Sequence, residues 1–213
     1  MLVTCLTVGP FEENCYLVVD STSRDAVLID PGDEGARLVR AVESADARLG
    51  AIWLTHAHVD HIGGIAAVRK VWNVPIHLHP LDEPIYRTGA MQAAFYGLAF
   101  EEPPSPDRAL ADGDVLAMGA MRFTVLHVPG HAPGHVAFHG HGAVFGGDCL
   151  FAGSIGRTDL PFANPADFGR SLERLCALPA ATTVHPGHGP STTIGAEQAT
   201  NPFLTGVARA PVR

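Results

Sequence analysis

Short apolar runs alternate with turn residues along the first part of the chain. Residues 2–8, 14–19 and 26–30 are such runs, and glycine or proline residues separate or follow them. Runs of this length between turn residues predict strands, here an opening antiparallel meander. Residues 33–47 instead place apolar side chains at helical spacing, and acidic residues at their start suit a helix N-terminus.

Strand and helix patterns continue to alternate through the rest of the chain. We predict strands at 51–54, 75–79, 121–128, 134–139, 143–147 and 182–185, and helices at 62–72, 83–99 and 165–178. The proline-rich stretch 102–107 is interpreted as a connection within one domain. Because the second half repeats the first in outline, two packed sheets with helices outside would bury both apolar sets. The predicted fold is α/β, a four-layer αββα sandwich of two similar halves in a single domain, 1–213.

Composition narrows the possible partners. The chain has 213 residues, 46% of them hydrophobic, and a formal charge of −8 without any run of lysine or arginine. A basic strip that could neutralise successive phosphates is missing, so we expect no nucleic-acid partner. The four cysteines are scattered and are interpreted as reduced thiols, and no apolar run reaches membrane-spanning length. These features predict a cytoplasmic protein without a membrane partner; they do not determine its oligomeric state.

The most distinctive chemistry lies in residues 55–61, Thr-His-Ala-His-Val-Asp-His, directly after a predicted strand. This segment supplies four candidate metal ligands: His56, His58, Asp60 and His61. Neutral imidazole and carboxylate suit borderline cations such as zinc, and the absence of cysteine from the segment argues against a structural thiolate site. The segment therefore predicts a catalytic metal centre.

Three later segments each place a further candidate ligand just beyond a predicted strand and beside glycine. These ligands are His131, Asp148 and His188. Glycine at such places lets the backbone approach an ion closely. A catalytic zinc uses three protein ligands and keeps one position open, so seven ligands exceed the needs of one ion. The count predicts a two-metal centre with one bridging carboxylate and room for water.

Other histidines are interpreted as supporting or structural. His77 and His79 share a predicted strand, but they lack a neighbouring carboxylate, and local hydrogen bonds explain such residues more simply. His135 and His185 lie close in sequence to candidate ligands. His135 and His185 are therefore the best candidates to contact the metal ligands without binding metal themselves.

Residues 55–61, with the three later ligands, resemble the metallo-β-lactamase superfamily over essentially the whole chain. Within it, segments 13–17, 153–161 and 187–195 resemble the glyoxalase II group, especially its short bacterial members. The resemblance implies a hydroxyacylglutathione hydrolase-like thioesterase that cleaves S-lactoylglutathione or a related small-molecule acyl thioester. It also implies two divalent metal ions, zinc or alternatively iron or manganese. The helical C-terminal extension that carries much of the glutathione site in long members is not expected here, because the chain ends soon after His188.

The family pattern also implies a place for each ligand. It assigns His56, His58 and His131 to the first ion, Asp60, His61 and His188 to the second, and Asp148 to a bridge between both. The implied mechanism is attack of a metal-bound hydroxide on the thioester carbonyl. Asp60 would orient the hydroxide, and Asp148 would hold the ions about 3.5–4 Å apart. Both aspartates are therefore the expected catalytic residues.

An acidic, peptide-like thiol should require cations for its recognition, and Lys70 is the only lysine. Arg157, in a Gly-Arg-Thr loop, is the preferred candidate over Arg87. The alternative interpretation of Arg157 is a guanidinium that stabilises its own loop by binding backbone carbonyls or Asp159.

Three alternatives to the thioesterase remain open. A persulfide dioxygenase of the same superfamily would hold one iron through His56, His131 and Asp148, a two-histidine, one-carboxylate site. A lactonase or β-lactamase is less favoured, the latter because the sequence shows no export signal. A non-catalytic metal-binding protein is also compatible with the fold, but a complete ligand set favours an enzyme.

Overall fold

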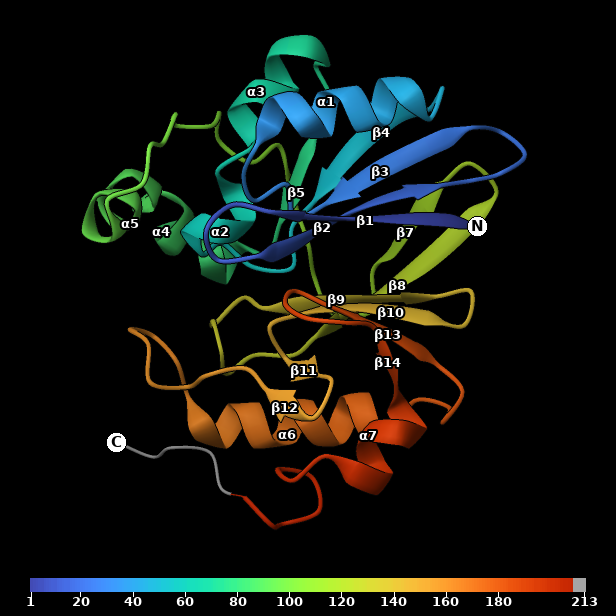
Figure 1. Ribbon diagram of the computed structural model, residues 1–213, viewed down its shortest axis with the longest axis vertical. Helices are drawn as coiled ribbons and strands as arrows, with labels where there is room; N and C mark the ends of the chain where they lie inside the picture. The colour runs from blue at the N-terminus through green and yellow to red at the C-terminus, as the bar shows by residue number, and fades with distance from the viewer. Residues whose placement is uncertain (209–213) are drawn as a thin grey trace.

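Two six-stranded sheets lie face to face with helices on their outer sides in the computed structural model, which describes residues 1–208 (Figure 1). The first sheet runs in sequence order: β1 (Leu2–Val8), β2 (Glu13–Val19), β3 (Asp25–Ile29), β4 (Arg48–Trp53), β5 (Ile76–Leu78) and β6 (Arg108–Ala109). Its first three strands are antiparallel and the following pairings, from β3 to β6, are parallel. The predicted opening meander is therefore confirmed.

The second sheet has the order β14-β13-β10-β9-β8-β7. Its strands are β7 (Val115–Met118), β8 (Met121–His127), β9 (Val136–Gly140), β10 (Ala143–Gly147), β13 (Thr183–Pro186) and β14 (Thr192–Thr193). Only the β10–β13 pair is parallel. A separate two-stranded hairpin is formed by β11 (Leu150–Phe151) and β12 (Ser154–Ile155).

Helices cover the outer face of each sheet (Figure 1). The first sheet is covered by α1 (Gly35–Ser44) and α3 (Ile65–Val71), and the second by α6 (Pro165–Cys176) and α7 (Ile194–Thr200). Four short helices lie towards one end of the molecule: α2 (Val59–Ile62), the 3₁₀ turn η1 (Pro80–Asp82), α4 (Glu83–Tyr86) and α5 (Gly89–Tyr96). No helix within residues 1–208 is long and apolar enough to cross a bilayer.

Successive side chains of the buried strands point to opposite faces of each sheet, and each face packs against a different layer of the fold. In β2, Leu17 packs in the core beneath α1 and α3, whereas its neighbour Val18 packs in the core between the sheets. A third core, between the second sheet and α6, contains Val144 and Phe168. Because successive residues of a strand point to opposite faces, a strand buried on both faces must be apolar throughout. The predicted four-layer αββα sandwich is confirmed.

Sequence patterns failed for the shortest or least apolar elements. The helix predicted at 83–99 is divided into α4 and α5, and Gly89, at the start of α5, packs so closely on Phe100 that a Cβ would lie 2.6 Å from its ring. Strand β7 was not predicted, because only Met118 of its four residues is buried. The hairpin, β14 and the seven-residue α7 have too few residues to display a period.

The core between the sheets depends on Trp53. Its ring is 1% exposed and contacts Phe123 and Phe138 of the second sheet at centroid distances of 5.5 and 5.3 Å. We expect Trp53→Ala to lower the free energy of unfolding by about 3–5 kcal/mol, the range for truncating a buried large aromatic. Urea unfolding followed by circular dichroism measures this loss. Val115→Ala, at an exposed strand position, is the matched control, and equal losses in the two variants would contradict the assignment.

Candidate metal centre

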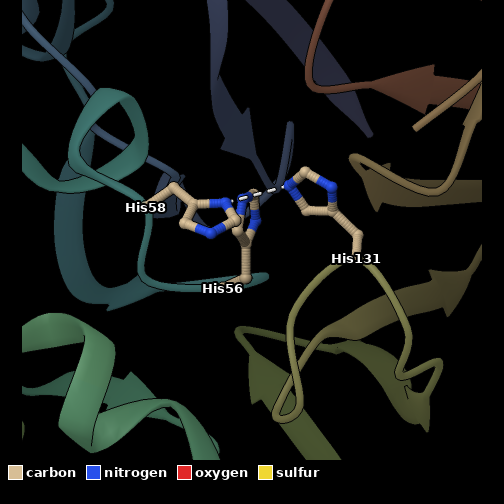
Figure 2. Close-up of side chains that lie close together, drawn as sticks. All are labelled: His56, His58 and His131. Carbon is tan, nitrogen blue, oxygen red and sulfur yellow. Dashed lines mark hydrogen bonds between the residues drawn. The ribbon is translucent and has the colours of Figure 1, made fainter. Parts of the chain in front are cut away.

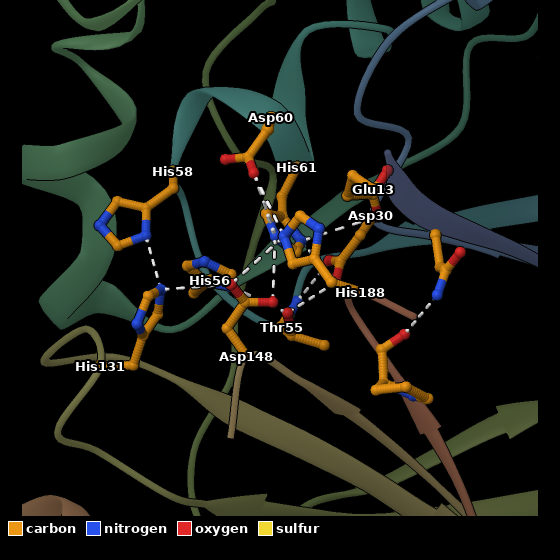
Figure 3. Close-up of polar contacts among 12 residues, drawn as sticks. Glu13, Asp30, Thr55, His56, His58, Asp60, His61, His131, Asp148 and His188 are labelled. Carbon is orange, nitrogen blue, oxygen red and sulfur yellow. Dashed lines mark hydrogen bonds and ion pairs between the residues drawn. The ribbon is translucent and has the colours of Figure 1, made fainter. Parts of the chain in front are cut away.

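All seven candidate ligands meet at one edge of the two sheets (Figure 3). Residues 55–58 follow β4 and lead into α2, which carries Asp60 and His61. Asp148 follows β10, and His188 follows β13, its parallel neighbour. His131 lies in the loop between β8 and β9. The carboxyl ends of parallel strands lie at the same edge of a sheet, which is why residues distant in sequence converge here.

Three histidines form one cluster. One ring nitrogen each of His56, His58 and His131 lies within 4.8 Å of the others, and Figure 2 shows the three rings facing a common point. Nδ1 of His58 is 2.9 Å from Nε2 of His131. The fold therefore brings together the three residues expected to bind the first ion.

A second cluster contains Asp60, His61 and His188, whose ligand atoms also lie within 4.8 Å of one another. Asp148 lies between the two clusters. Its Oδ2 is 3.6 Å from Nε2 of His131 and 3.4 Å from Nε2 of His188, and its Oδ1 is 3.5 Å from Nε2 of His61 (Figure 3). One carboxylate thus faces both clusters, as a bridging ligand must.

The outer ring nitrogens of four histidines have hydrogen-bond partners. Nδ1 contacts Thr55 Oγ1 for His56, Asp30 Oδ2 for His61, the Arg157 carbonyl for His131 and the Phe11 carbonyl for His188, at 2.8–3.1 Å. Acceptors at these positions assign the proton to Nδ1 and leave Nε2 with a lone pair. A metal-binding histidine usually donates its other N–H in this way.

The inward atoms lack such partners. Nε2 of His56, Nε2 of His61 and Oδ1 of Asp148 are buried and accept or donate no hydrogen bond. Buried polar atoms without partners are rare because no hydrogen bond offsets the free-energy cost of removing them from water. Histidine nitrogens and carboxylate oxygens aimed at a common space fit a pair of divalent cations.

Burial also sets the charge of these groups. It lowers the pKa of His56 well below its usual value and that of His58 to about 3, and neighbouring imidazoles add to both effects. Both rings stay neutral, which is the form that binds metal. At Asp148 burial opposes ionisation, but the imidazoles of His61 and His188 hold its pKa well below the usual range. Neutral rings at His56 and His58 beside an ionised carboxylate favour the binding of a cation.

A family model described as the metallo-beta-lactamase superfamily matches residues 8–188. The chain belongs to the metallo-β-lactamase superfamily. Hydroxyacylglutathione hydrolase GloC of Haemophilus influenzae is 36% identical over 209 residues, 96% of this chain and 98% of that protein. Probable metallo-hydrolase YqgX of Bacillus subtilis is also 36% identical, over 94% and 96% of the two chains.

Solved structures show the same metallo-β-lactamase fold. TTHA1623, in a di-iron-bound form, is 49% identical with a TM-score of 0.88 over 95% of this chain and 100% of that one. The B3 metallo-beta-lactamase BLEG-1 is 35% identical with a TM-score of 0.90, over 96% and 100%. ETHE1 from Myxococcus xanthus is 28% identical with a TM-score of 0.80, over 97% and 85%. The protein is a metallo-hydrolase of this superfamily, and its histidine and aspartate clusters match a two-metal site.

Two buried carboxylates behind the metallo-β-lactamase ligands were not singled out from the sequence. Asp30, at the end of β3, accepts hydrogen bonds from the backbone and hydroxyl of Thr55 and from His61. Both oxygens of Asp30 accept hydrogen bonds, so we assign Asp30 the role of orienting Thr55 and His61 rather than that of a metal ligand. Glu13 lies 3.8 Å from Nδ1 of His61, and burial raises its pKa well above the usual value. An acidic residue directly after an apolar run was the available signal for Asp30, as it was for Asp148.

Glycine permits the closest approaches in the site. A Cβ on Gly187 would lie 2.1 Å from Oδ1 of Asp148. Gly147 has a φ of +48°, and a Cβ there would lie 2.4 Å from the hydroxyl of Thr55. At both positions glycine lets the backbone lie against a residue of the site, where any side chain would clash.

The supporting histidines differ from one another. Nε2 of His135 accepts a hydrogen bond from the backbone N–H of Asp148 at 3.0 Å, so this buried ring positions the bridging carboxylate. His185 instead stacks on Phe145 and contacts Ser191, and it touches no candidate ligand. His79 accepts a hydrogen bond from the backbone of Leu81, and neither it nor His77 belongs to a ligand cluster among residues 1–208.

Arg157 has the loop-stabilising contacts that its alternative interpretation predicts. Its guanidinium forms two hydrogen bonds to Asp159, at 2.7 and 2.9 Å, and its carbonyl holds His131. The side chain is 58% exposed and borders a cleft of about 820 Å³. The floor of this cleft includes five candidate ligands: His58, Asp60, His131, Asp148 and His188.

Asp82 joins the two loops that carry the first cluster, and no sequence pattern indicated it. Its Oδ2 accepts a hydrogen bond from the Ala57 N–H at 3.0 Å, and its Oδ1 accepts one from the Gly134 N–H at 2.5 Å. Ala57 separates His56 from His58. Burial raises the pKa of Asp82 to about 7, although both N–H groups favour the carboxylate.

Replacing Asp82 by alanine leaves two buried N–H groups without an acceptor. Each such group costs about 1–3 kcal/mol, so we expect a loss of roughly 2–6 kcal/mol in the free energy of unfolding. Metal affinity should fall about 10-fold or more, as for other residues that orient ligands. Urea unfolding of metal-free protein and metal titration measure the two effects. Glu173→Ala, at an exposed helix position, is the control, and wild-type stability of Asp82→Ala would contradict the role.

Proposed function

We propose that the protein is a glyoxalase II-like thioesterase that hydrolyses S-lactoylglutathione or a related small-molecule acyl thioester. His56, His58 and His131 would hold one divalent ion, and Asp60, His61 and His188 a second. Asp148 would bridge them. The observation that carries this proposal is the carboxylate of Asp148, which lies 3.4–3.6 Å from imidazoles of both clusters.

Two bound ions would supply a nucleophile at neutral pH by lowering the pKa of coordinated water to about 7, and would polarise the carbonyl. The chain provides the positioning. Asp60 lines the cleft, and its Oδ2 is 3.4 Å from Nε2 of His188, so it can accept a hydrogen bond from the attacking water. His135 fixes the backbone of Asp148, and Asp30 fixes the ring of His61. No serine nucleophile is needed for this chemistry.

Zinc is the proposed metal, with iron or manganese as alternatives. Imidazole and carboxylate ligands without thiolate accommodate all three. The similarity to TTHA1623 in a di-iron-bound form supports iron as the first alternative. A cytoplasmic location is part of the proposal, supported by four cysteines that form no disulfide among residues 1–208.

The thioesterase proposal competes with a mononuclear-iron persulfide dioxygenase. That enzyme would use only His56, His131 and Asp148. The close approach of Asp60, His61 and His188 to one another favours the two-metal hydrolase, because a one-ion site leaves this second cluster without a role.

Metal analysis with two assays tests the choice. We expect two metal ions per chain and hydrolysis of S-lactoylglutathione or a simpler acyl thioester, without oxygen uptake. One iron per chain with oxygen consumption on glutathione persulfide would refute the hydrolase. A β-lactam in the same panel tests for the β-lactamase activity that the name of BLEG-1 states. Hydrolysis of the β-lactam without hydrolysis of any thioester would refute the thioesterase proposal.

Replacing Asp148 with alanine removes the carboxylate that faces both clusters. We expect metal content to fall below two ions per chain and thioester turnover to fall by roughly 100-fold or more. Elemental analysis after dialysis gives the first quantity, and steady-state kinetics give the second. Asp60→Ala should also lower thioester turnover.

The control is Glu102→Ala, which removes an exposed carboxylate outside the cleft. Full turnover of Asp148→Ala at two bound ions per chain would show that the carboxylate neither bridges nor assists the reaction.

A further inference from the structure

Exposed aromatic side chains gather along the walls of the cleft. The aromatic rings that are most exposed among residues 1–208 belong to Phe11, Phe95, Tyr96 and Phe162, and all four line this cleft. Phe95 is 82% exposed and Phe162 is 69% exposed. Such concentration differs from the scattered single apolar residues of an ordinary surface, and it marks a site of binding.

These residues come from three separate segments. Phe11 lies in the turn between β1 and β2, Phe95 and Tyr96 end α5, and Phe162 lies in the loop before α6. Tyr96 contacts both Phe11 and Phe95 edge to face, each at a centroid distance of 5.0 Å. Met91, 67% exposed, extends the same wall one turn earlier on α5. Phe11, Tyr96 and Phe95 therefore form a contiguous apolar surface beside the metal ligands, and Phe162 adds an exposed ring to the cleft from another segment.

Positive charge is scarce in the same place. Arg157 is the only arginine or lysine that lines the cleft within residues 1–208, and its Nε and Nη2 both donate hydrogen bonds to Asp159. Lys70 is paired with Glu101 and does not line the cleft. Recognition of carboxylates depends on available guanidinium or ammonium groups. The two carboxylates of a glutathione thioester find no such set of partners here.

We infer that the cleft selects acyl thioesters with an apolar chain or ring and an uncharged thiol portion, in preference to glutathione thioesters. This inference rests on the proposed thioesterase function and names its substrate class. The apolar part of the substrate lies against Phe95, Tyr96 and Phe162 while the carbonyl lies over Asp60 and Asp148. Burial of each methylene against this wall is favourable by up to about 0.8 kcal/mol, so affinity should rise with chain length.

The test compares S-lactoylglutathione with acyl thioesters of N-acetylcysteamine from acetyl to octanoyl. We expect kcat/KM to rise by roughly 10-fold or more from acetyl to octanoyl, because pocket burial of methylenes discriminates to this extent. The octanoyl thioester should also exceed S-lactoylglutathione. A flat dependence on chain length, or a preference for S-lactoylglutathione, overturns the inference.

Variants locate the selectivity. Phe95→Ala and Phe162→Ala should reduce the octanoyl-to-acetyl ratio of kcat/KM by several-fold, mainly through a higher KM for octanoyl. Leu81→Ala is the matched control, because Leu81 is apolar and 54% exposed but does not line the cleft. An unchanged ratio in both phenylalanine variants contradicts the assigned wall.

A non-hydrolysable thioether separates this inference from the thioesterase proposal. S-octyl-N-acetylcysteamine should bind metal-loaded protein in calorimetry, and more weakly to Phe95→Ala. If no thioester is hydrolysed but the thioether binds in this way, the thioesterase proposal fails and apolar recognition stands. If the apolar wall instead joins two copies of the chain, sedimentation shows a dimer that Phe95→Ala dissociates, the thioether does not bind, and the inference is overturned.

Discussion

The structure depends on a cluster of buried polar atoms that have partners on one side only. The outer nitrogens of four histidines, His56, His61, His131 and His188, all contact hydrogen-bond acceptors. The buried inward atoms of His56, His61 and Asp148 have no hydrogen-bond partner. Satisfied outer bonds hold the rings in place, and the unsatisfied inner atoms leave a space that suits cations. Hydrogen bonds from the scaffold therefore help to set the directions of the ligands.

Hydrogen bonds between the two halves of the chain maintain this arrangement. Tyr16 donates to the Pro186 carbonyl at 2.7 Å, and the Asn14 amide donates to the carbonyls of Pro186 and Gly189. These bonds bind β2 of the first sheet to the segment that carries His188. Trp53 packs across the same interface between the sheets, immediately before the first ligand loop. Apolar packing between the sheets and polar bonds at their edge thus determine one relative position of the two clusters.

The sequence predicted what local patterns encode. Runs such as 14–19 are long enough to show that both faces are buried, and residues 55–61 concentrate ligands whose chemistry is specific. It could not predict Asp82, because a single carboxylate acquires its role only when Ala57 and Gly134 approach it in space. His135 and His185 were equivalent by sequence proximity, yet only His135 contacts a ligand residue. Such residues are distinguished by contacts between segments that are distant in sequence, and the periodicity of the sequence does not predict those contacts.

Floor and wall of the cleft belong to different parts of the fold. The floor consists of residues in α2 and in the loops that follow β4, β8, β10 and β13, so its geometry is coupled to the hydrophobic cores that hold these strands. Met91, Phe95 and Phe162 lie in α5 and a loop, and their exposed side chains belong to none of those cores. Exposed side chains can change without the cavity cost that follows a core substitution. The fold therefore separates the candidate metal ligands, which are tied to the cores, from the exposed aromatic residues to which we assign substrate selection.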